Sequence, residues 1–194
     1  VASGVASDLQ QTIVAMGGDF RQFSEHTLGT AQVMNAIEGS AISQKELFND
    51  IAASSNAAKL SMKAQGNDMS KTAFEARKLG LTLQQQESIQ KGLLDFESSI
   101  AAELEAEMLL GKELNLDKAR LAALNGDQAT LTAEIAKNVG TAEEFGKLNY
   151  IQQEAIAKVF GMQRGDFADM LVKQEYMNKL KEKGYDDESK AAKA

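Results

Sequence analysis

The sequence predicts an all-α protein, and three observations lead to this prediction. The 194 residues contain no proline, although the loops of sheet-containing proteins commonly use it. Hydrophobic residues make up 43% of the chain and aromatic residues only 6%, so the core falls mainly to Ala, Leu, Ile and Met, several of which are strong helix formers. Apolar residues recur at gaps of three and four along much of the chain, which is typical of amphipathic helices.

The N-terminal part, residues 1–40, has the weakest helical pattern. Residues 5–16 and 32–37 have helical spacing, but Gly17-Gly18 and Gly29 interrupt the pattern. A glycine inside a helix costs about 1 kcal/mol relative to alanine. The expected organisation is therefore a loosely packed helical part, one helical domain and a frayed tail or linker, at residues 1–40, 41–183 and 184–194.

The helical domain opens with a capping box, Ser43-x-x-Glu46, in which each side chain bonds the other residue's backbone N–H. The apolar stripe that follows consists of Leu47, Ile51, Ala58 and Met62. The next helix is predicted to begin at Asn67-Asp68 or Ser70. It ends at Gly80, because a glycine suits the left-handed position after a helix.

The longest predicted helix covers residues 82–110. Thr82-x-x-Gln85 caps it, Gly111 ends it, and Gly92 inside it suggests a close crossing with another helix. Its apolar residues recur at gaps of four or three and form the candidate helix-packing interface: Ile89, Leu93, Phe96, Ile100, Leu104 and Met108.

Shorter helices are predicted in the remainder of the domain. One begins near Asn115, and the next covers residues 128–138 behind an Asp127 cap and ends at Gly140. Two further helices are predicted to begin at Thr141-x-x-Glu144 and at Asn149-x-x-Gln152. A final helix is predicted over residues 166–183.

Composition and charge exclude several classes of function. The absence of cysteine removes disulfides, thiolate metal sites and a cysteine nucleophile, and the single histidine excludes paired-histidine metal sites. No stretch approaches the roughly 18 apolar residues of a membrane span. The formal net charge of −7 disfavours non-specific binding to a phosphate backbone. The chain begins at Val1 without a signal-peptide pattern, which suggests a processed product or part of a longer chain.

Two groups of polar residues could carry chemistry, and each has a simpler interpretation. Glu103 and Glu107 lie one turn apart on a helix and could form a metal or acid–base pair, but a solvated helix face is the favoured interpretation. His26 follows Phe20 and Phe23, and no nucleophile motif accompanies it. The sequence thus predicts no enzyme and no cofactor.

Residues 153–175 show a pattern of a helix, a glycine turn and a second helix, which is typical of a helix-turn-helix DNA-binding motif. The exposed start of a recognition helix carries side chains that contact bases and phosphates. Here Arg164 is the one basic residue at that start, against Asp166 and Asp169. A packed helical pair is the favoured interpretation, and DNA binding remains the less favoured one.

Several short sequence segments from residue 78 onward resemble segments of tail tape measure proteins of long-tailed bacteriophages. The resemblance lies in KLGLT at 78–82, GLLDFESSIAAELEAEMLLGKELNLDKAR at 92–120, ALNGD at 123–127 and LNYIQQEAIAKVFGM at 148–162. It covers about half of the chain well and residues 47–78 loosely.

The resemblance implies a structural role in the virion. Such proteins are long and helical, occupy the tail tube in a few parallel copies, set tail length and leave ahead of the genome. The implied partners are further copies of the chain, the tail tube and the tail-tip or baseplate hub proteins. The alternative is a non-enzymatic helical adaptor that binds a protein partner through the stripe from Ile89 to Met108.

Overall fold

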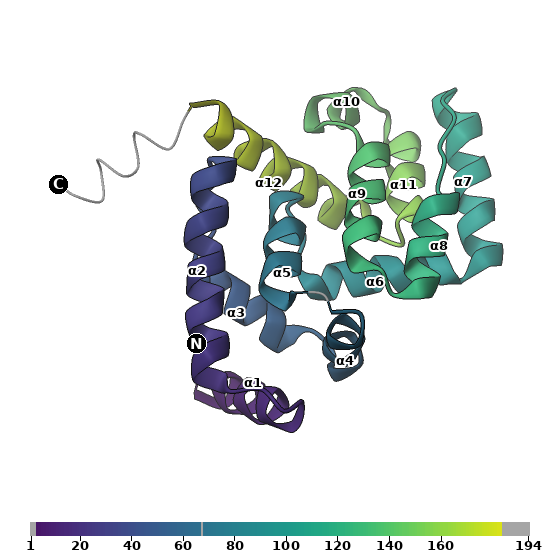
Figure 1. The fold of residues 1–194 in the computed structure, drawn as a ribbon. Helices are drawn as coiled ribbons and strands as arrows, with labels where there is room; N and C mark the ends of the chain where they lie inside the picture. The colour runs from purple at the N-terminus through teal and green to yellow at the C-terminus, as the bar shows by residue number, and fades with distance from the viewer. Residues whose placement is uncertain (1–2, 67, 184–194) are drawn as a thin grey trace. The chain divides into compact units, whose positions relative to one another are not determined.

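The computed structural model describes residues 3–66 and 68–183, and it confirms the all-α prediction. Within these residues there are twelve helices and no strand (Figure 1). The helices are α1 (Ser3–Ala15), α2 (Phe20–Glu38), α3 (Gln44–Ala53), α4 (Asn56–Ala64), α5 (Met69–Lys78), α6 (Leu83–Leu94), α7 (Phe96–Leu110), α8 (Asp117–Asn125), α9 (Gln128–Val139), α10 (Ala142–Lys147), α11 (Tyr150–Val159) and α12 (Arg164–Lys183). The tail predicted at 184–194 and the possible helix start at Asn67 lie outside the described residues.

The chain forms two compact units, which we describe separately. Unit 1 contains residues 1–78, 82–84 and 176–194. Unit 2 contains residues 79–81 and 85–175. The division falls near residue 80 and not at residue 40, where the change of pattern along the sequence placed it.

Contrary to the expected loose packing of residues 1–40, α1 and α2 pack on the rest of unit 1. Helix α1 contacts α2 and α3, and α2 contacts α3 and α5. Leu9 and Ile13 of α1 and Ala31 of α2 are buried. Gly29 lies inside α2 and does not interrupt it. Tertiary packing of a whole helix face outweighs the roughly 1 kcal/mol cost of one glycine.

Partly buried polar contacts join the helices of unit 1. Asn35 near the end of α2 donates to the carbonyl of Ile42 at 2.7 Å and accepts from its N–H at 3.0 Å, which fixes the turn into α3. Arg77 of α5 donates two hydrogen bonds to the Asp50 carboxylate of α3, at 2.6 and 2.7 Å. Burial raises the pKa of Asp50, and the hydrogen bonds and positive charge of Arg77 act against that rise.

The apolar stripe from Leu47 to Met62 belongs to two helices and not to one. The capping box of Ser43 and Glu46 begins α3 as predicted, but α3 ends at Ala53. Ser55 then caps α4 by accepting from the Ala58 N–H at 3.1 Å. The apolar spacing continues across this break, so the periodicity alone did not reveal the capping serine that stands inside the stripe.

Unit 2 is built from paired helices, in which α7 contacts α11 and α8 contacts α9 (Figure 1). Three predicted caps are confirmed: the Asp127 cap of α9, the Thr141–Glu144 box of α10 and the Asn149–Gln152 box of α11. A buried and a half-buried amide attach α6 to this group. Gln86 donates to the Gln128 carbonyl at 2.9 Å, and Gln90 donates to the Ala123 carbonyl at 2.8 Å.

Glycines allow two backbone segments of unit 2 to approach closely, although the partner of Gly92 is a turn and not the helix that the sequence analysis expected. A Cβ atom at Gly92 would lie 3.3 Å from the Cα of Gly161, in the turn between α11 and α12. Gly161 has a φ of +63°, which glycine adopts without strain. Helix α6 and this turn therefore meet through two residues that lack side chains.

Candidate interaction surface on helix α7

The predicted helix over residues 82–110 consists of two helices, so the prediction of one long helix is wrong. Helix α6 ends at Leu94 and α7 begins at Phe96. Asp95 stands between them with a ψ of 77°, outside the helical region, and its side chain accepts from the Ser98 N–H. The aspartate occupies the N-cap position of α7, and the helix is interrupted there although the apolar periodicity continues through it.

This break separates the candidate helix-packing interface into a buried half and an exposed half. Ile89 and Leu93 of α6 are fully buried. The remaining four members belong to α7 and are exposed: Phe96 by 46%, Ile100 by 45%, Leu104 by 55% and Met108 by 84%. We call these four residues the α7 stripe.

Helix α7 has its small residues on the buried side and its large apolar residues on the exposed side. Ser99, Ala102 and Ala106 are the buried residues of the helix, which packs on α11. A helix on the surface of a protein normally turns its large apolar side chains toward the core. This inverted arrangement leaves a row of large apolar side chains without cover within the described chain, as is common at interaction surfaces.

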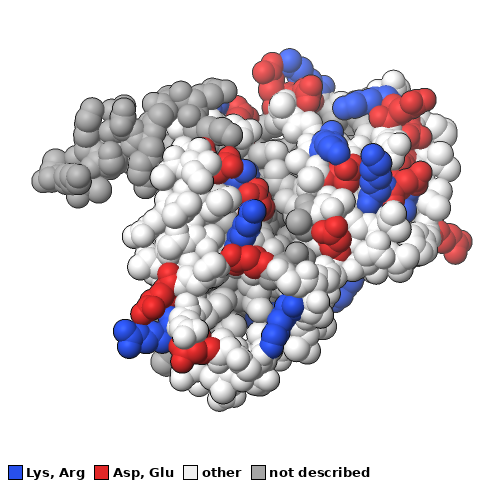
Figure 2. All heavy atoms as spheres, in the orientation of Figure 1, with Lys and Arg blue, Asp and Glu red and all other residues white. Residues whose placement is uncertain are grey.

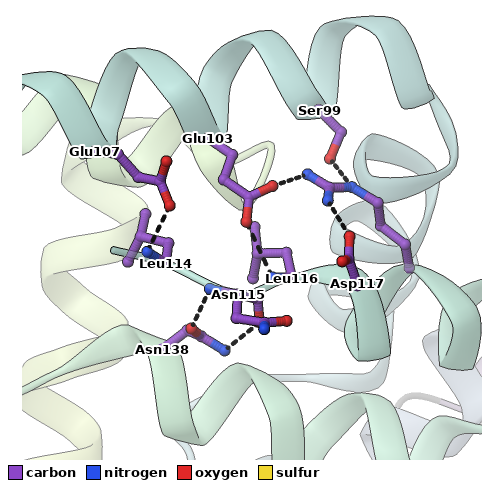
Figure 3. Close-up of polar contacts among 9 residues, drawn as sticks. Ser99, Glu103, Glu107, Leu114, Asn115, Leu116, Asp117 and Asn138 are labelled. Atoms are coloured by element: carbon purple, nitrogen blue, oxygen red, sulfur yellow. Dashed lines mark hydrogen bonds and ion pairs between the residues drawn. The ribbon is translucent and has the colours of Figure 1, made fainter. Parts of the chain in front are cut away.

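Polar side chains hold the linker that follows α7 against the helix (Figure 3). Glu103 accepts from the Leu116 N–H at 3.0 Å and from the buried guanidinium of Arg120, which also donates to Ser99 at 3.0 Å. One turn later, Glu107 accepts from the Leu114 N–H at 2.8 Å. The linker and Arg120 of α8 are therefore fixed to one side of α7.

These contacts give Glu103 and Glu107 a structural role. Glu103 and Glu107 are partly buried, so the favoured interpretation of a solvated helix face is wrong for both. Their oxygens bind backbone N–H groups and an arginine, and the geometry gives them a structural role. Among the described residues, no cluster of three or more His, Asp or Glu side chains is placed to hold a metal ion.

Residues 153–175 form a packed helical pair, α11 and α12, with a start of α12 that is unsuited to reading DNA. Arg164 donates to Gln153 at 3.1 Å and lies 4.6 Å from the centre of the Tyr150 ring. Asp166 and Asp169 are exposed on the same helix. The basic side chain is occupied within the chain, and the exposed charges at this position are negative.

His26 also has a structural partner. Its Nε2 lies 2.6 Å from an oxygen of Asp68, whose other oxygen accepts from the N–H of Ser70 at the start of α5. The contact joins α2 to α5 within unit 1.

Charged side chains of both signs are interspersed on the face drawn in Figure 2, and no continuous basic area is seen there. None of the helices in the described residues has the length and hydropathy that crossing a bilayer requires.

Comparison with known proteins returned no match among family models, curated proteins or solved structures. The structural argument for a function therefore depends on the α7 stripe.

Sequence periodicity identified all four members of the α7 stripe, but it did not show that they are exposed. It also missed Arg120, whose partner Glu103 lies 17 positions earlier in the chain, at a separation that no helix periodicity reports. The acidic run before Lys112 gave no indication that two of its glutamates bind the next linker.

Proposed function

We propose that this chain is a structural, non-enzymatic segment of a bacteriophage tail tape measure protein. It sets tail length with further copies of itself, occupies the tail tube before genome ejection and contacts the tube and the tail-tip or baseplate hub proteins. It is assembled in the host cytoplasm and becomes part of the virion. The observation that carries the proposal is the α7 stripe, a surface suited to contact between copies.

Several further features agree with this role. The chain has no disulfides, and its helices are joined by short glycine, serine and asparagine breaks. Short helices separated in this way unfold and refold at low cost, which suits passage through a narrow tube. The net charge of −7 limits adhesion to the DNA that follows.

The first experiment is multi-angle light scattering over a range of protein concentrations, with circular dichroism on the same samples. We expect a helical oligomer, such as a trimer or hexamer. Leu104→Asp should shift it to the monomer, because the substitution places a charge inside the contact. Leu60→Asp is the matched control, since Leu60 of α4 is also 55% exposed but belongs to unit 1 and not to the stripe.

A cooperatively folded chain that stays monomeric at every concentration would contradict the proposal. The same stripe would then be the docking surface of the alternative, a helical adaptor that binds a different protein. A second experiment tests the role in the tail directly, by deleting helical residues from the parent chain. Tail length measured by electron microscopy should fall by about 1.5 Å for each deleted residue that is helical in the tube.

A further inference from the structure

Two parts of the chain share one layout, which consists of a helix, a turn that contains a glycine, and a second helix. Helices α5 and α11 are each 10 residues long. The second helices, α6 and α12, each begin at the fifth position after the first helix of their pair ends. Corresponding boundaries are 81 positions apart throughout: Met69 and Tyr150, Lys78 and Val159, Leu83 and Arg164. We call residues 68–94 the first module and residues 149–175 the second module.

The caps and the buried positions of the two modules also correspond. In the first module, Asp68 accepts from the Lys71 N–H at 3.2 Å and caps α5. In the second module, Asn149 accepts from the Gln152 N–H at 3.0 Å and caps α11. Both residues of this second bond again stand 81 positions after their counterparts. The side chains buried at equivalent positions are Ala76 and Ala157, Gln86 and Phe167, and Ile89 and Met170.

The two modules contact each other through their turns, and the contacting residues all belong to unit 2. A Cβ atom at Gly80 of the first module would lie 2.9 Å from the Cβ of Lys173 in the second. A Cβ atom at Gly161 of the second module would lie 3.5 Å from the Cα of Gly92 in the first. Lys173 stands 12 positions after Gly161, and Gly92 stands 12 positions after Gly80. Each turn therefore lies against the equivalent position of the other module.

The rules of helix capping do not account for this reciprocal contact. They favour a glycine after any helix, because glycine adopts the left-handed conformation without strain, but they do not select what the turn contacts. A contact in which both partners use the same pair of positions is isologous, and it is the contact that a two-fold axis produces. The first and second modules meet this condition.

We infer that the two modules are two instances of one self-recognising helical unit, related by an approximate two-fold axis, and that their contact is a clasp that closes unit 2. The partner that fits the surface of each module is the other module of the same chain. The clasp joins segments near the beginning and the end of unit 2, at Gly80 and Lys173. Because both turn contacts belong to one interface, we expect them to be lost in a single opening step. The inference concerns contacts within one chain and does not depend on the proposed self-association.

The two halves of the clasp differ in how tightly they pack. At Gly80, an added Cβ would lie 2.3 Å from the carbonyl oxygen of Met170, which is far inside van der Waals contact. At Gly161, the nearest atoms would lie at 3.5 and 3.8 Å, which is ordinary contact. Gly111, also in unit 2, has the same φ of +63° as Gly161 and no atom within 4 Å of an added Cβ. Gly111→Ala is therefore the control for the strain of a left-handed alanine alone.

Native-state hydrogen exchange on the full chain measures whether the clasp opens in one step. In Gly80→Ala, the amides of α6 and those of α12 up to Glu175 should both exchange faster. Their acceleration should exceed that of the α8 and α9 amides in the same sample by about tenfold or more. Gly161→Ala should accelerate the same two segments by a smaller factor. Gly111→Ala should lower protection by about five- to thirtyfold without selecting α6 and α12.

Each outcome of this experiment decides for or against the clasp. The same two segments must respond whichever of the two turns is changed, so if Gly80→Ala does not fold, the milder Gly161→Ala decides. Acceleration confined to α6 or to α12 would show that the two contacts are independent and would overturn the inference. Acceleration spread evenly over α8 and α9 would also overturn it, because the clasp would then not open as a unit. A chain that is monomeric but opens α6 and α12 together would contradict the proposed self-association and leave the clasp standing.

Discussion

Helices α6 and α7 follow each other in the chain and share one apolar periodicity, but they use it in opposite ways. In α6, Ile89 and Leu93 are fully buried within the protein. In α7, Leu104 and Met108 are exposed, and alanines occupy the buried side. The comparison teaches that periodicity locates the apolar side of a helix without showing whether the core or another molecule covers it.

The two helices also differ in the polar contacts that attach them to unit 2. Gln86 and Gln90 of α6 are neutral amides that donate to backbone carbonyls of neighbouring helices. Helix α7 instead uses the carboxylates of Glu103 and Glu107 to bind the linker and Arg120. Removing a polar partner should therefore cost most on α7, and removing an apolar side chain should cost most on α6.

The largest effect is expected for Arg120→Met, which removes the cation from the buried side of α7. Glu103 would keep a largely buried carboxylate without its ion pair, so the free energy of unfolding should fall by about 3–5 kcal/mol. Denaturant titration measures this change. Arg21→Met is the control, because the Arg21–Glu25 pair is exposed and should contribute less than about 1 kcal/mol.

The comparison between the two helices can be tested with the same substitution on each. Leu93→Ala on α6 should lower the free energy of unfolding by about 2–5 kcal/mol, because it leaves a cavity in the core. Leu104→Ala on α7 should change the monomer's stability by no more than about 0.5 kcal/mol. Equal losses in chemical denaturation would show that α7 is covered in the same way as α6.

A paired glycine substitution tests the close approach of α6. Gly92→Ala should destabilise the protein by about 1–3 kcal/mol, because the new methyl group would lie 3.3 Å from the Gly161 Cα. Gly146→Ala on α10 has no atom within 4 Å of the added Cβ and should stabilise by up to about 1 kcal/mol. Thermal unfolding should therefore give shifts of opposite sign for the two variants.

The Asp95 cap at the break between α6 and α7 should contribute only modestly to the free energy of unfolding. Asp95→Ala should cost about 0.5–1 kcal/mol, since the bond from the Ser98 N–H is long at 3.5 Å. Asp19→Ala at the start of α2 should cost more, because the corresponding bond from Gln22 is 2.8 Å. The reverse order in urea titrations would show that other contacts set the break.

The smallest effect concerns pH and Lys78 of α5, which forms an ion pair with Glu38 of α2. Burial opposes the charged form of Lys78, but hydrogen bonds to Glu75 and Glu38 raise its pKa above the ordinary value. A lysine with a raised pKa contributes stability below its unfolded pKa of about 10.4, and this contribution is lost as the pH rises through the folded value. Lys78→Met should therefore differ in stability from the natural chain at pH 8, and the two should converge as the pH rises through the raised folded pKa of Lys78, as measured by urea titration at each pH.

Local signals predicted most of the fold. The capping boxes at Ser43, Thr141 and Asn149 are confirmed, because a cap depends on residues within one turn of the chain. Two helix breaks were missed, at Ser55 and Asp95, where a capping residue stands inside an uninterrupted apolar stripe. At both positions the periodicity was given more weight than the cap.

The candidate site could be predicted only in part, because its other components come from distant segments. The members of the α7 stripe follow one helical spacing and are visible in the sequence. Arg120 reaches Glu103 from the next helix, and the linker after α7 supplies the N–H groups that Glu103 and Glu107 bind. Such neighbours arise from tertiary packing and leave no periodic pattern in a single sequence.

The contact between Gly92 and Gly161 has a consequence for how this protein can evolve. The two glycines are restricted for different reasons: a Cβ at Gly92 would lie 3.3 Å from the Gly161 Cα, whereas Gly161 has a φ of +63° that disfavours any side chain. In a library randomised at both positions, glycine should be retained at 161 whichever residue stands at 92, and the double alanine should lose more than the sum of the single losses. In related chains, glycine at 161 should therefore persist more strictly than glycine at 92.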